Sequence, residues 1–124
     1  MSSQKERLMA CLQNAYGTEP EYLWESSPND PVFRHGESRK WYALMMDIPK
    51  NHLGLAGNEI ISILDIKCNP LMIGSLLSRK GFLPAYHMNK SHWITILLDD
   101  TLADEEILPL IDMSYDSVTP KRRK

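Results

Sequence analysis

The sequence is poor in cysteine and has no long hydrophobic run. Cys11 and Cys68 are its only cysteines, and neither belongs to a CxxC motif, so a disulfide-stapled scaffold is excluded. Residues 1–17 are polar and charged and lack the apolar segment of a secretory signal peptide. Apolar stretches such as residues 94–98 are far too short to cross a bilayer. We therefore expect a cytoplasmic protein with reduced thiols and no contact with a membrane.

Recognisable catalytic and cofactor motifs are also missing. The sequence holds no GxGxxG fingerprint and no P-loop, so we expect no cofactor. His87 and His92 lack the further, closely spaced ligands of a zinc site, so we expect no metal. Cys68 lies between a predicted strand and a predicted helix, where a thiol can be acidified. We predict no catalytic residue, but an enzyme or small-molecule binder that uses Cys68 and histidines stays open as an alternative.

Charged residues are segregated along the chain, although the net charge is only −2. Residues 66–98 contain no acid, whereas residues 99–116 contain seven acids and no base. The acid-free segment carries these basic residues and histidines: Lys67, Arg79, Lys80, His87, Lys90 and His92. Residues 121–124 form a basic C-terminal tail. Folding could turn this pattern into a molecule with one positive and one negative side; the alternative is chance clustering on solvated faces.

The length and the apolar fraction of 43% fit a single globular domain, which we place at residues 1–120. Ser3 and Glu6 form a capping box that predicts a first helix ending near Gly17. Its apolar stripe is expected to comprise Leu8, Met9, Leu12 and Ala15. Residues 18–31 hold three prolines and are predicted to form a loop. The apolar side chains of that loop expected to tuck against the core are Tyr22, Leu23 and Trp24.

The rest of the chain predicts a sheet with helices. Alternating residues predict a hairpin over 32–35 and 40–48 and strands over 59–67 and 92–98, with an irregular segment at 82–91. Within 40–48, one face is expected to carry Tyr42, Leu44, Met46 and Ile48, and the other Trp41, Ala43 and Met45. Asn69 and Pro70 predict the start of a helix that Gly81 ends. A last helix is predicted over 104–118, with Pro109 causing a kink or a later start. This order predicts an α+β domain, an antiparallel sheet with helices packed on it.

Residues 86–93 mix cationic, imidazole and aromatic side chains outside regular structure. Cations neutralise phosphates and aromatic rings stack on bases, so this mixture suits a nucleic-acid surface. The alternative is structural: Trp93 begins a strand and packs inward, Asn89 makes a turn and Lys90 points to water.

Four segments together resemble the successive motifs of the MmcQ/YjbR family. They are DIKCNP at residues 65–70, HMNKSHW at 87–93, LDDTL at 98–102 and LIDMSY at 110–115. The resemblance implies a CyaY-like, double-wing α+β fold and a proposed role in DNA binding. It departs from the family pattern where Asp100 and Thr101 replace Gly-Ser in the turn, and at Pro109.

We therefore predict a small non-enzymatic domain that contacts the backbone of double-stranded DNA through a basic surface. The predicted contact residues are Lys67, Arg79, Lys80, His87, Asn89, Lys90, His92 and Trp93. The main alternative is a protein-interaction module that uses the acidic last helix or an exposed sheet edge.

Overall fold

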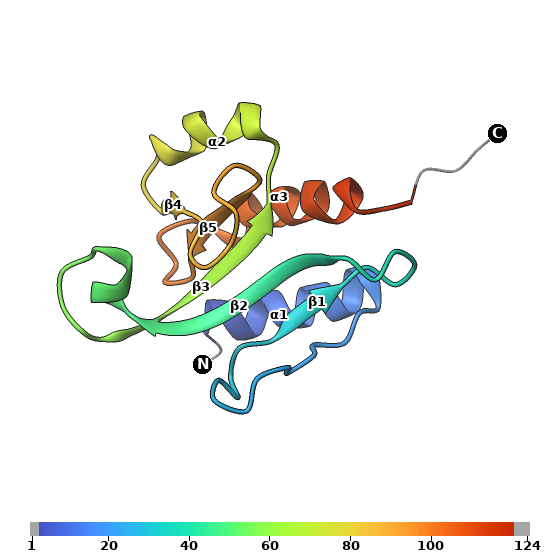
Figure 1. The fold of residues 1–124 in the computed structure, drawn as a ribbon, viewed down its shortest axis with the longest axis horizontal. Helices are drawn as coiled ribbons and strands as arrows, with labels where there is room; N and C mark the ends of the chain where they lie inside the picture. Colours follow the sequence, from blue (N-terminus) through green and yellow to red (C-terminus); the bar gives the residue numbers. More distant parts are fainter. Residues whose placement is uncertain (1–2, 121–124) are drawn as a thin grey trace.

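The computed structural model describes residues 3–120 and shows an α+β domain (Figure 1). The elements in chain order are α1 (Gln4–Tyr16), β1 (Val32–Arg34), β2 (Trp41–Pro49), the 3-10 helix η1 (Lys50–Leu53), β3 (Ile60–Lys67), α2 (Pro70–Leu77), β4 (Phe82–Pro84), β5 (Trp93–Leu97) and α3 (Asp104–Ser117). The five strands form one sheet in the order β1-β2-β3-β5-β4, and every neighbouring pair is antiparallel. The predicted fold class is confirmed. The basic tail at residues 121–124 lies outside the described residues.

Helices α1 and α3 cover one face of the sheet, and the main core lies between them and the strands (Figure 1). Leu8 and Leu12 of α1 and Ile107 and Ile111 of α3 are all completely buried in this core. Each buried aliphatic side chain of this size stabilises the fold by roughly 1.5–3 kcal/mol. None of the helices in residues 3–120 is both long and apolar enough to span a bilayer.

The opposite face of the sheet is covered by loops and the 3-10 helix η1 instead of α-helices. Its core comprises Val32, Leu44, Met46, Ile48, Ile61 and Ile63. Tyr86 and Met88, from the segment before β5, and Leu53 of η1 pack over these residues. The segment of residues 87–93 therefore covers part of this second core through Met88.

A bulge at Tyr42 overturns the alternation expected for β2. The register between β1 and β2 shifts at this point, and Tyr42 has no partner in β1. The extra residue turns Tyr42 to the helix-covered face, where its ring lies edge-on to Tyr115 at 5.0 Å. Its hydroxyl shares a 2.5 Å hydrogen bond with Thr18, and burial raises its pKa to about 12. Placing Tyr42 on the face of Leu44 was wrong because a bulge resets the alternation.

The first helix is tied to the loop that precedes the last one. Ser3 and Glu6 form the predicted capping box. The Gln4 amide donates to the Leu102 carbonyl at 2.8 Å, and its oxygen accepts from the Asp100 N–H at 2.8 Å. Gln4 is therefore a buried polar residue whose amide is satisfied by a loop almost 100 residues away.

Several local expectations were wrong. Ala15 is exposed instead of lying in the buried stripe of α1. Tyr22, Leu23 and Trp24 are exposed rather than tucked in, although Trp24 contacts Trp41 edge-on. The segment predicted to be irregular contains the short strand β4. Helix α2 begins at Pro70 as predicted but ends at Leu77, four residues before Gly81.

Helix α3 begins at Asp104 and runs continuously past Pro109. The alternative prediction, that the helix begins later because of Pro109, was wrong. Position 109 is the sixth residue of the helix, so its missing N–H interrupts the hydrogen-bond ladder just after the first turn. Its side chain is exposed, which keeps the proline ring out of the core.

Candidate nucleic-acid interface

Asn89 organises the loop that joins β4 to β5. Its carbonyl accepts hydrogen bonds from the N–H groups of His92 at 3.1 Å and Trp93 at 2.9 Å. Its side-chain oxygen accepts from the Ser91 N–H at 2.8 Å. Asn89 is the turn residue of this loop, as the structural alternative predicted. Because both oxygen atoms of Asn89 are engaged within the loop, its side-chain NH₂ group is the part that can still contact a ligand.

Beneath this loop lies a carboxyl group that the sequence analysis did not single out. Asp65 of β3 is 0% exposed. The Tyr86 N–H donates to the Thr95 hydroxyl at 2.9 Å, and that hydroxyl donates to Asp65 Oδ1. Asp65 Oδ2 has no hydrogen-bond partner among the described residues. Burial raises the pKa of Asp65 to about 7, against the opposing effects of the Thr95 hydroxyl and the Lys90 charge. This short hydrogen-bond chain fixes the start of the loop to the sheet.

Trp93, one of the predicted contact residues, is buried in the protein. It is the first residue of β5, pairs with Lys67 of β3 and is 9% exposed. A base can stack only on a ring face that water also reaches. The prediction that Trp93 contacts nucleic acid is therefore contradicted by its burial, whereas its predicted place at the start of a strand is confirmed.

Four of the predicted contact residues divide into two groups at opposite ends of β5. Lys67 and His92 lie beside its first residue, because the Cys68 N–H donates to the His92 carbonyl at 2.7 Å. Arg79 and Lys80 lie near its last residue, where the Leu97 N–H donates to the carbonyl of the following Gly81. The two ends of β5 are four residue steps apart, a distance of about 13 Å. The single gathered surface that we expected is therefore not formed.

Arg79 is also neutralised locally. Its guanidinium bonds Glu106 of α3 at 2.6 Å and lies 5.4 Å from the centre of the Phe82 ring. Both charged side chains are about half exposed, so the pair itself contributes little stability. Its consequence is for recognition, because Arg79 no longer offers an uncompensated charge to a phosphate.

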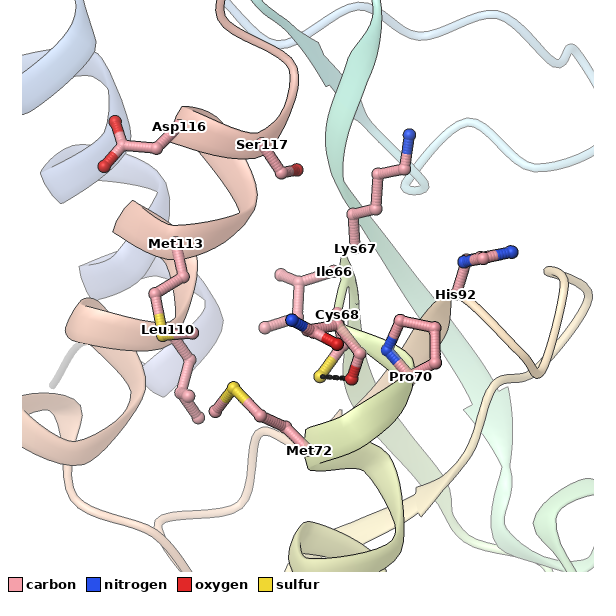
Figure 2. Close-up of a pocket in the computed structure, with 11 residues that line it drawn as sticks. Ile66, Lys67, Cys68, Pro70, Met72, His92, Leu110, Met113, Asp116 and Ser117 are labelled. Atoms are coloured by element: carbon pink, nitrogen blue, oxygen red, sulfur yellow. Dashed lines mark hydrogen bonds between the residues drawn. The ribbon is translucent and has the colours of Figure 1, made fainter.

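Lys67 and His92 border a cavity of about 500 Å³ between α2, α3 and the end of β3 (Figure 2). Figure 2 shows their side chains extending away from the sulfur atoms of Cys68, Met72 and Met113, which face the interior of the cavity. Asp116 of α3 lies on its opposite rim. The cavity therefore has an apolar, sulfur-rich interior and a mixed-charge rim.

The Cys68 thiol in this cavity is not set up as a nucleophile. Burial raises its pKa, whereas a reactive cysteine needs a lowered one. Sγ lies 3.7 Å from the Asn69 carbonyl, its only hydrogen-bond partner in the described residues, and no histidine bonds it. The residues described also contain no group of three or more histidine, cysteine, aspartate or glutamate side chains placed to hold a metal ion. The alternative of an enzyme that uses Cys68 therefore lacks a side chain placed to take the proton of the thiol within the described residues.

His87 and Lys90 border a different cavity, of about 340 Å³, together with His52 of η1. None of the residues that line it is acidic. His87 has a φ of 60°, which is uncommon for a non-glycine residue, and its ring lies 4.0 Å from that of Tyr86. Such outliers concentrate at functional sites. At this cavity the fold brings Lys90 and His87 of the predicted motif together with His52 on one concave surface.

His52 was missed because it lies in a connection between strands, more than thirty residues before the motif. Nothing in the local sequence shows that η1 folds back over residues 83–90. Asp65 was missed for a related reason: a carboxylate among the apolar residues of a predicted strand was the only sequence signal of its burial.

The fold and this loop define a small α+β domain in which a loop with histidine and lysine side chains lies over the face of the sheet opposite α1 and α3. The YjbR family model matches residues 13–117. This chain therefore belongs to the YjbR family.

Related proteins and structures agree with this membership. The uncharacterized protein YyaQ of Bacillus subtilis (strain 168) is 40% identical over 111 residues, which cover 90% of this chain and 94% of YyaQ. The uncharacterized protein YjbR of Escherichia coli (strain K12) is 50% identical over 32 residues, 26% of this chain and 27% of YjbR.

A crystal structure of a Pseudomonas syringae protein has a TM-score of 0.91 and 41% identity, covering 96% of this chain and 100% of that one. A crystal structure of a Deinococcus radiodurans protein has a TM-score of 0.66 and 25% identity, covering 91% of this chain and 79% of that one. These similarities establish the family and the fold.

Proposed function

We propose that this protein is a small non-enzymatic domain that binds double-stranded DNA through the phosphate backbone. The observation that carries the proposal is the cavity lined by His52, His87 and Lys90 without any carboxylate. A lysine charge attracts phosphates, and histidine ring N–H groups around the same concave surface can donate hydrogen bonds to them, without reading bases. Residues 66–98 contain no acid in the sequence, and no acid from elsewhere in the described chain lines this cavity.

The state of Asp65 supports this surface. Asp65 lies buried under the loop, and the positive charge of Lys90 lowers its pKa against the larger, opposite effect of burial. Below its pKa of about 7 Asp65 is mostly protonated and does not offset the charge of Lys90, and Lys90 forms no ion pair within residues 3–120. Arg79 differs in this respect, since it is paired with Glu106. The proposed contact surface is therefore centred on Lys90 and His87, with Lys67 and His92 beside it and Arg79 and Lys80 outside it.

Salt dependence of DNA binding distinguishes these cations. Fluorescence anisotropy of a labelled duplex is measured over a series of salt concentrations for the natural protein, Lys90→Ala and Arg79→Ala. We expect Lys90→Ala to reduce the slope of log K against log salt by about 0.9, because one phosphate contact is lost. Arg79→Ala is the matched control, since it also removes one exposed cation, and its slope should stay unchanged.

Two results would end the proposal. One is the absence of any anisotropy change at low salt; the other is an equal loss of slope in both variants, which would indicate unspecific attraction to the whole molecule. A second duplex of unrelated sequence should bind with similar affinity, because backbone contacts carry no sequence information.

Protein interaction is the second candidate function, and the exposed aromatic loop favours it. Tyr22 is 52% exposed and Leu23 is 44% exposed, and exposed apolar side chains grouped together often mark interaction sites. The sheet edges offer less, because β1 and β4 have three residues each and β4 ends in a proline. A partner that stays bound at high salt and is released by Tyr22→Ala, with no DNA binding at low salt, would favour this function.

A further inference from the structure

A larger cavity lies between β2 and the loop of residues 18–31, with residues 86–88 on its rim. Its volume is about 530 Å³, within the range of small-molecule sites. Three aromatic side chains line it: Trp24 from the loop, Trp41 from β2 and Tyr86 from the segment before β5. Trp24 and Trp41 meet edge-to-face with their ring centres 5.9 Å apart. Aromatic side chains from three separate segments of the chain thus line the same cavity.

The charges around this cavity are negative. Asp30 and Asp47 line it, and no lysine or arginine does. Asp47 is compensated, since its Oδ1 lies 3.0 Å from Lys5 Nζ and accepts a hydrogen bond from Ser62. Asp30 accepts the Asp47 N–H at 3.0 Å and forms no ion pair within the described part of the chain. One carboxylate is therefore left without a cation beside the aromatic walls.

We propose that this cavity binds a small organic cation that carries a quaternary ammonium group. The faces of tryptophan and tyrosine rings attract cations through their quadrupoles, most strongly where water is excluded. The Arg34 guanidinium lies 5.9 Å from the Trp41 ring centre, and its charge is compensated by an ion pair with Glu21 at 3.2 Å. A quaternary ammonium needs no hydrogen-bond acceptor, which suits a cavity whose Asp47 carboxylate is engaged elsewhere. Anionic ligands are disfavoured by Asp30.

Cation binding at this cavity is separable from DNA binding, although His52, Tyr86 and His87 border both cavities. The DNA surface depends on Lys90, which does not line the aromatic cavity. The two activities are separable by variants: Lys90→Ala should leave cation binding intact, and Trp24→Ala should leave the salt slope of DNA binding intact.

The test compares choline with its neutral isostere, in which carbon replaces the quaternary nitrogen. Binding to the full chain is followed by amide chemical shifts in NMR titrations up to about 100 mM ligand, a range that covers weak millimolar affinity. We expect saturable shifts for choline at Trp24, Trp41 and Tyr86, and at least about fivefold weaker binding of the isostere, because only the charged ligand gains the cation–π and carboxylate attraction.

Variants then assign the binding to this cavity. Trp24→Ala and Asp30→Asn should each weaken choline binding about fivefold or more. Tyr22→Ala is the matched control: Tyr22 is an exposed aromatic residue of the same loop that does not line the cavity. Trp24 is itself 38% exposed, so its removal should leave the fold intact, which the spectrum of each variant verifies. Equal affinity for the two ligands, no saturable binding, or shifts confined to other parts of the protein would each overturn the proposal.

Discussion

Replacing Asp65 by asparagine should change how the stability of the protein depends on pH. In the folded protein the carboxyl is completely buried, and its pKa is about 7 against an ordinary value of 3.8. Between these two values the folded state holds a proton that the unfolded chain has released. Raising the pH through this window therefore lowers the free energy of unfolding. Below about pH 4 the contribution of the protonated group is fully present, and above about pH 7 it is lost.

The size of the effect follows from the same two values. The window spans about three pH units, and each is equivalent to about 1.4 kcal/mol. The natural protein should lose up to about 4 kcal/mol relative to Asp65→Asn between pH 4 and pH 7. The asparagine has the same shape and can still accept from Thr95, but it has no proton to lose. Some absolute destabilisation of the variant is expected because its buried NH₂ replaces an oxygen that has no partner.

Urea denaturation of both proteins at several pH values between about 4 and 8 measures this difference. Asp116→Asn, which removes an exposed carboxylate of α3, is the matched control, and its profile should run parallel to that of the natural protein. A carbon-13 NMR titration of the Asp65 carboxyl provides a direct reading. Parallel profiles for Asp65→Asn and the natural protein, or a carboxyl that titrates near pH 4, would refute the assignment of Asp65 as a buried acid that keeps its proton.

Three further substitutions test the packing, each by urea denaturation. Ser114→Ala should destabilise the protein by about 2 kcal/mol, because the buried hydroxyl donates to the Tyr42 carbonyl at 2.6 Å and accepts the Lys67 N–H at 2.9 Å; a neutral result would mean that water replaces it. Gly81→Ala should lower stability by more than about 1 kcal/mol, since φ is +101° and a Cβ would approach Leu102 Cγ to 2.8 Å. Ser3→Ala should remove about 1 kcal/mol with the N-cap, and an unchanged midpoint would show that α1 does not depend on it.

The elements of the fold could largely be predicted because their signals are local. The capping box of Ser3 and Glu6 and the Asn69-Pro70 helix start each involve residues within one turn. The strands were found from alternation, which reports on one strand at a time. The β2 bulge escaped the same method, since it is defined by the partner strand and by the space that Tyr42 fills near Tyr115.

The candidate site could be predicted only in part, because charge along a chain does not determine charge on a surface. Arg79 belongs to a segment without acids, yet the fold brings Glu106 within 2.6 Å of it. Trp93 was identified as a possible base contact and lies inside the sheet. Lys90 and His87 remain at the surface, joined by His52, which the sequence places far away.

The ties between Gln4 and the loop before α3 have a consequence for synthesis on the ribosome. The partners of this side chain follow it by 96 and 98 residues. At typical translation rates, roughly 5–20 s pass between the emergence of Gln4 and that of Leu102. The contacts of Gln4 are therefore among the last to form, whereas Tyr16 of the same helix can pack on Tyr42 much earlier. The N-terminal end of α1 thus waits longest for its final partners.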